Sequence, residues 1–144
     1  MNRADLYLLN TPALSEQVSF CCRLTEKAFD EFDRIHIQTS ESVQNEALDT
    51  ALWTFKPESF LPHDIGQAIE PAPPIIIDSK NLQEGLFKSK NLLILLATTL
   101  PSNAVNFDRM CILVPNDDAE IQHARTLYKT LKQQGVDVHI HDMR

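Results

Sequence analysis

Glycine is scarce in this sequence of 144 residues, which contains only Gly66, Gly85 and Gly135. None of them forms a GxG pair or precedes a Lys-Ser/Thr dipeptide, so the dinucleotide-binding fingerprint and the P-loop are both missing. A GxSxG nucleophile elbow is missing as well. The remaining enzyme hypothesis is a small nucleotide-dependent enzyme whose site leaves no local signature.

Cysteine is also rare, and the three present form neither a disulfide framework nor a spaced metal motif. We therefore expect a cytoplasmic protein. Cys21 and Cys22 are neighbours, which point about 100° apart on a helix, so we expect one of them to be buried. His139 and His141 share a strand face, but only Asp142 stands beside them, and two ligands are too few for a metal site. No metal and no cofactor are predicted.

The sequence has no long apolar run and no excess of positive charge. Its longest run, residues 92–97, is far shorter than the roughly 20 residues of a membrane span, and no export signal is recognisable at the N-terminus. Thirteen basic against twenty acidic side chains give a net charge of -7, which repels a phosphate backbone. We expect no membrane association and no strong direct DNA binding.

The length and the 43% hydrophobic content suit one domain covering residues 1–144. Apolar runs and alternating patterns predict strands at 5–9, 34–38, 75–77, 91–98, 111–114 and 136–140. Helical spacing and capping residues predict helices at 15–32, 42–54 and 117–134. Strands that alternate with helices favour an α/β fold: a single Rossmann-like domain with a largely parallel sheet and helices on both faces. The proline-containing segment 55–74 is predicted to be a structured loop, and 78–90 gives no clear prediction.

One segment, residues 48–63 (LDTALWTFKPESFLPH), has a pattern more specific than fold. It resembles the signature of the DNA polymerase III chi subunit family, matching at Leu48, Asp49, Ala51, Leu52, Trp53, Pro57, Glu58, Ser59, Phe60, Pro62 and His63. Weaker agreement continues at the first strand, at Val114-Pro115 and along the last helix. The resemblance implies a non-catalytic accessory subunit of the polymerase clamp-loader complex, acting in DNA replication through two protein-binding surfaces.

The first implied surface binds the small psi subunit. Large apolar groups gather in and beside the proline-stiffened loop, and tryptophan is enriched at interface hot spots. The residues expected there are Trp53, Phe60, Leu61, Pro62 and His63. Two alternatives stay open: Trp53 as a core residue covering the end of its helix, and a repair helicase that occupies this surface in place of psi.

The second implied surface binds the acidic C-terminal tail of single-stranded DNA-binding protein. On the last predicted helix an apolar stripe lies beside a basic flank, which suits a peptide with a terminal aromatic ring and carboxylates. The residues expected there are Arg125, Lys129, Tyr128, Val114 and Lys132. Ile121 stands where the resemblance would place another basic residue, a departure that concerns the affinity for the tail and not the location of the site. The alternative is a solvated basic flank with no partner.

Overall fold

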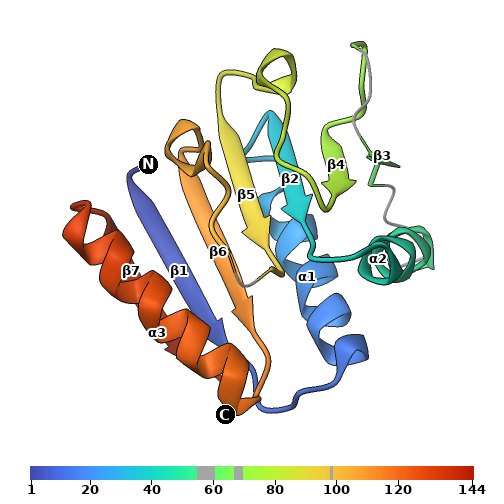
Figure 1. The fold of residues 1–144 in the computed structure, drawn as a ribbon. Coiled ribbons are helices and arrows are strands. Elements are labelled where there is room, and N and C mark those ends of the chain that lie inside the picture. Colours follow the sequence, from blue (N-terminus) through green and yellow to red (C-terminus); the bar gives the residue numbers. More distant parts are fainter. Residues whose placement is uncertain (55–60, 67–69, 98) are drawn as a thin grey trace.

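A computed structural model describes residues 1–54, 61–66, 70–97 and 99–144 (Figure 1). These residues form one seven-stranded sheet in the order β3-β4-β2-β5-β6-β1-β7, with every neighbouring pair parallel. The strands are β1 (Arg3–Leu8), β2 (Arg34–Gln38), β3 (His63–Ile65), β4 (Ile75–Asp78), β5 (Asn91–Leu95), β6 (Arg109–Val114) and β7 (Asp137–Asp142). The helices are α1 (Leu14–Ala28), α2 (Ser42–Thr54) and α3 (Asp118–Gln133), with 3-10 turns at Glu84–Leu86 and Ala104–Asn106.

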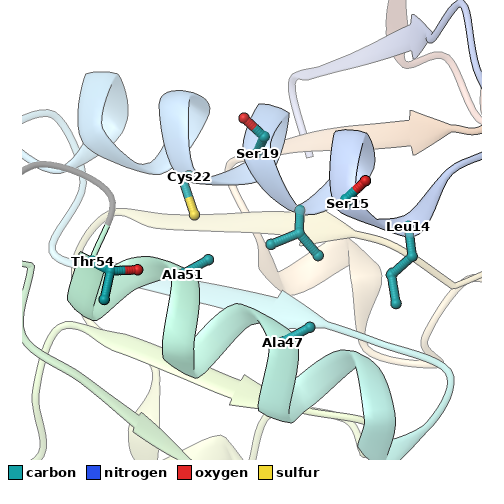
Figure 2. Close-up of a pocket in the computed structure, with 8 residues that line it drawn as sticks. Leu14, Ser15, Ser19, Cys22, Ala47, Ala51 and Thr54 are labelled. Atoms are coloured by element: carbon teal, nitrogen blue, oxygen red, sulfur yellow. The ribbon is translucent and has the colours of Figure 1, made fainter.

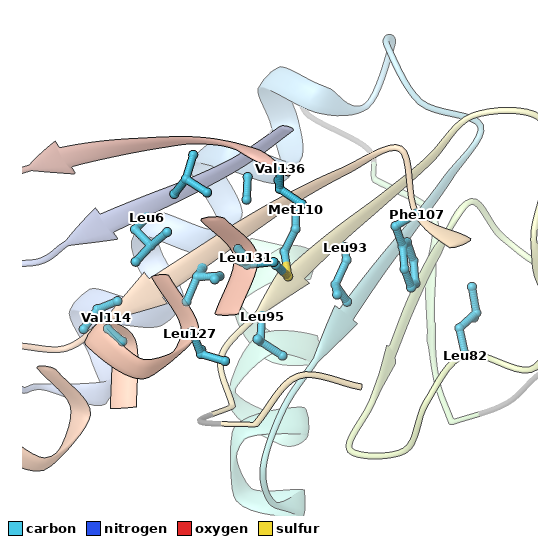
Figure 3. Packing of buried hydrophobic residues seen from close by; sticks show 14 of the residues in the cluster. Leu6, Leu82, Leu93, Leu95, Phe107, Met110, Val114, Leu127, Leu131 and Val136 are labelled. Carbon is cyan, nitrogen blue, oxygen red and sulfur yellow. The ribbon is translucent and has the colours of Figure 1, made fainter. Parts of the chain in front are cut away.

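Helices cover both faces of the sheet, as predicted. In Figure 1, α3 crosses one face in front of β1, while α1 lies on the other face behind the central strands. Apolar side chains fill the space between α3 and the sheet, where Leu127 and Leu131 of the helix lie over Leu6 and Met110 (Figure 3). A second core cluster lies on the α1 and α2 side. The α/β, Rossmann-like prediction is confirmed.

The segment that gave no clear prediction covers a part of the α3 side that no described helix reaches. Leu82 and Leu86 are buried there in the same cluster as Phe107. His36 of β2 stacks beside the Phe107 ring, with centroids 6.3 Å apart, and its Nε2 lies 3.1 Å from the Lys80 carbonyl oxygen. Burial lowers the pKa of His36 to about 4, so this histidine is a neutral core residue.

Three predictions about these elements were wrong. Both Cys21 and Cys22 are buried, because α1 packs against the sheet and against α2 at once and so has two buried faces. Segment 55–74, predicted as loop, contains β3, whose three residues are too few to show a strand pattern. Helix α1 also ends at Ala28, four residues early, although Phe32 still reaches the core.

A buried carboxylate joins three strands on the α1 side of the sheet. Asp5 of β1 is fully buried and accepts hydrogen bonds from Arg3 at 2.9 Å, Arg109 of β6 at 2.9 Å and His141 of β7 at 2.8 Å. Burial alone would raise the pKa of Asp5, but hydrogen bonds from Arg3 and His141 and the charge of Arg109 outweigh it and lower the pKa. The ionised form of Asp5 therefore stabilises the fold.

We predict that Asp5→Asn destabilises the protein by about 1–3 kcal/mol, because the neutral amide keeps only one acceptor oxygen and turns an NH2 group toward the charged donors. A carboxyl whose pKa is lowered by folding stabilises the protein at pH values above its ordinary pKa. This contribution is lost progressively as the pH falls below about 5. Urea unfolding at several pH values should therefore show a difference from the wild type at pH 7 that shrinks on acidification. Asp64→Asn, an exposed change on β3, is the control. A constant difference down to pH 3 would contradict the prediction.

Candidate functional site

A small pocket lies between α3 and the strands β1 and β7. Its volume is about 280 Å³, and we call it the α3 pocket. It is lined by Leu6, Leu8, Ile121, Ala124, Arg125, Tyr128, Lys129, Ile140 and Arg144. Three of these side chains are cationic and the others are apolar or aromatic. The pocket can therefore hold an apolar group while binding an anionic group at its margin.

Both ends of helix α3 have the features expected of helix caps. The Asp117 carboxylate accepts a hydrogen bond from the backbone N–H of Glu120 at 3.2 Å, and Gly135 takes a left-handed conformation with φ of +79° beyond the last turn. The apolar stripe packs on the sheet through Ala124 and two buried leucines. Packing of this stripe leaves the basic residues on the exposed side of the helix, where a ligand can reach them.

The structure brings together three of the five residues predicted for the tail. Arg125, Tyr128 and Lys129 all line the α3 pocket. Lys132 does not line it, but its Nζ lies over the Tyr128 ring, 5.8 Å from the centroid. Val114 is only 3% exposed and belongs to the core, so it supports the pocket from inside the protein.

Sequence reasoning missed the half of the pocket that the strands supply. Leu6 and Leu8 come from β1, Ile140 from β7, and Arg144 follows β7. Strand order was needed to find them, since β1 ends at Leu8 and β7 begins only at Asp137, and the two strands pair in the sheet through Leu6 and Ile140. One signal was available in the sequence, where Ile140 is an apolar residue in an alternating strand. The structure leaves Ile140 53% exposed.

The described residues of the signature segment, 48–54 and 61–63, form a second feature at the β3 edge of the sheet. Trp53 on α2 is 57% exposed, so it is not the core residue that one alternative predicted. Its ring packs against His63 of β3 at 4.8 Å between centroids. An exposed tryptophan resting on a buried side chain is typical of a binding surface.

His63 fixes the position of this surface. Its imidazole is buried, with Nδ1 2.6 Å from the Leu61 carbonyl oxygen and Nε2 3.1 Å from a carboxylate oxygen of Asp49. The Asp49 contact joins α2 to β3, and Asp49 lies about one helical turn before Trp53. Leu61 is also buried, Pro62 is half-buried, and the predicted contact Phe60 lies outside the described residues. His63 and Leu61 therefore support the surface, while Trp53 presents it.

Another hollow, of about 430 Å³, lies between α1 and α2 (Figure 2). Small side chains surround it, among them Ser15, Ser19, Ala47 and Ala51, which Figure 2 shows along the facing sides of the two helices. Burial raises the pKa of the Cys22 thiol in its wall to about 11, which keeps the sulfur protonated at neutral pH. The hollow therefore has no activated thiol nucleophile.

Two places that could hold phosphate or metal, the start of α3 and the His139/His141 pair, are engaged in other interactions. Asp117 caps α3 and is followed by Asp118, so negative charge stands where a phosphate would dock. His139 contacts Asp137 at 2.9 Å and His141 contacts Asp5 at 2.8 Å, so the two histidines have separate carboxylate partners. Within the described residues no group of three or more potential ligands has metal-binding geometry, and no helix could cross a membrane.

Comparison with known proteins agrees with the signature. Residues 1–139 match the family described as DNA polymerase III chi subunit, HolC. A DNA polymerase III subunit chi of Pseudomonas aeruginosa is 30% identical over 141 residues, covering 98% of this chain and 96% of the relative. Those of Haemophilus influenzae and Escherichia coli are 29% and 28% identical, with 92% and 96% of this chain covered and 91% and 96% of the relatives. This chain therefore belongs to the DNA polymerase III chi subunit family.

Proposed function

We propose that this protein is a non-catalytic, cytoplasmic accessory subunit that links two partners during DNA replication. One partner is the psi subunit, which would connect it to the clamp loader, and the other is the acidic C-terminal tail of single-stranded DNA-binding protein. The observation that carries the proposal is the placement of the two candidate surfaces. The Trp53 surface lies at the β3 edge of the sheet and the α3 pocket at the β7 edge, so both partners can bind at once.

The α3 pocket suits a peptide with carboxylates and a terminal aromatic ring. Apolar side chains of β1, β7 and α3 would hold the ring, and the Arg125 guanidinium would bind the terminal carboxylate. Lys129 and Lys132 lie within two further turns of the same helix and would attract the acidic residues. Charges at exposed sites are screened over about 8–10 Å at ordinary salt, so binding should be measured at low ionic strength.

The Trp53 surface suits an apolar partner. Trp53 rests on His63, which is itself held by Asp49, so little side-chain freedom is lost when a partner covers the ring. Ile65 on β3 is exposed as well and extends the apolar area along the same edge. A repair helicase is the alternative partner for this surface, and it would compete with psi instead of binding beside it.

We predict that Arg125→Ala weakens binding of an acidic, phenylalanine-terminated peptide by about 1.5–3 kcal/mol, the value of a hydrogen bond to a charged group. Fluorescence anisotropy at low salt measures the change. Amidation of the peptide's C-terminus should weaken binding by a similar amount, and the two changes together should cost little more than either alone, because they remove the same contact. Arg23→Ala, an exposed change on α1, is the control and should leave the affinity unchanged.

We predict that Trp53→Ala weakens association with purified psi by at least about 2 kcal/mol, the threshold of an interface hot spot, and leaves peptide binding intact. Isothermal titration calorimetry measures both affinities. Val105→Ala, which truncates an exposed apolar residue within the 3-10 turn Ala104–Asn106, is the control. Unchanged psi affinity in the Trp53 variant would remove this surface from the proposal.

A further inference from the structure

Arg144 is a cationic residue of the α3 pocket that the resemblance does not supply. It lines the pocket together with Arg125 and Lys129 but comes from the segment that follows β7. Ile121, on α3, lines the same pocket at the position where another basic residue was expected. The pocket thus has a guanidinium on its strand side and an apolar residue in place of a charge on its helix side.

Asp142 holds Arg144 in a two-point ion pair. The Nε of Arg144 donates to one carboxylate oxygen and Nη2 to the other, each at 3.0 Å, and the Arg144 backbone N–H donates to the first oxygen at 3.0 Å. The side chains are 42% and 53% exposed, so solvent and ligands reach both of them. A guanidinium has five N–H donors, and this ion pair uses two of them.

Asp142 lies on the pocket side of β7. It is two residues from Ile140, which lines the pocket, and side chains two apart on a strand share a face. The Asp142 carboxylate therefore lies beside the cationic residues of the pocket, Arg125, Lys129 and Arg144, and has the same negative charge as the carboxylates of the expected ligand. It cancels part of the field of Arg144 and occupies one of the two edges of the guanidinium that can bind a carboxylate at two points.

We propose that Arg144 is a second carboxylate-binding residue of the α3 pocket and that Asp142 competes with the incoming peptide for it. This inference rests on the proposed tail binding and adds its regulation by a neighbouring residue. The ligand class is a peptide that carries more than one carboxylate beside an apolar terminal residue. Such a peptide can bind Arg125 and displace Asp142 at once, whereas a ligand with one carboxylate has no charge left to exchange with Asp142. The internal ion pair thereby selects for acidic peptides.

The test uses four forms of the full chain: wild type, Asp142→Asn, Arg144→Ala and the double variant. Their affinities for an acidic, phenylalanine-terminated peptide are measured by fluorescence anisotropy at low salt. Asp142→Asn should tighten binding about two- to fivefold, as expected for one exposed ion pair. Arg144→Ala in the Asp142→Asn background should abolish that gain. Equal affinities for Asp142→Asn and the double variant would overturn the proposal, because the gain would then not pass through Arg144.

Two further variants distinguish a failure of this inference from a failure of the proposed tail binding. Asp64→Asn makes the same charge change on β3 at the opposite edge of the sheet and should leave the affinity unchanged. An equal gain in that variant would reduce the effect to net charge and refute the role of Asp142. If Arg125→Ala weakens binding while Asp142→Asn has no effect, only the present inference fails. If the peptide binds neither the wild type nor Asp142→Asn, the proposed tail binding fails with it.

Discussion

The structure depends on one constraint: the central strands of its parallel sheet must be covered on both faces. Every residue of β2 and β5 is buried, and β6 is buried beyond its first residue. The backbone and side chains of these central strands therefore belong to the core and cannot contact a partner. Only the ends and the two edge strands, β3 and β7, can carry exposed groups of the sheet, and both candidate surfaces lie there. A fold of this kind separates two binding surfaces by the full width of its sheet.

Local patterns predicted most of the elements, and non-local geometry accounts for what they missed. Helix α2 and strand β2 have the predicted bounds, and α3 begins at the predicted cap. Those features depend on residues a few positions apart, which a single sequence shows directly. The strand side of the α3 pocket depends on β1 lying beside β7, and the inward position of Val114 depends on α3 covering β6. Neither relation is visible in the spacing of residues along the chain.

The signature segment combines two physical roles that its sequence does not separate. Leu48, Leu52 and Leu61 are buried, and the His63 ring of β3 contacts Asp49 on α2. These residues fix the geometry of the edge. Trp53 is in the same motif and yet remains exposed on top of them. Sequence reasoning listed Leu61, His63 and Trp53 together as contacts, because a motif identifies a region and only burial tells framework from surface.

The overall charge of -7 and the cationic margin of the α3 pocket have different consequences. The net charge acts on any polyanion that approaches from a distance and disfavours the backbone of nucleic acid. The local cations act within about one Debye length, where a short acidic peptide can place its carboxylates without bringing a long charged polymer to the surface. A second partner held at the opposite edge would raise the local concentration of that peptide, so weak binding at the pocket is enough for a lasting link. The same arrangement would give each surface its own partner, because neither ligand would need to move the sheet that separates the two surfaces.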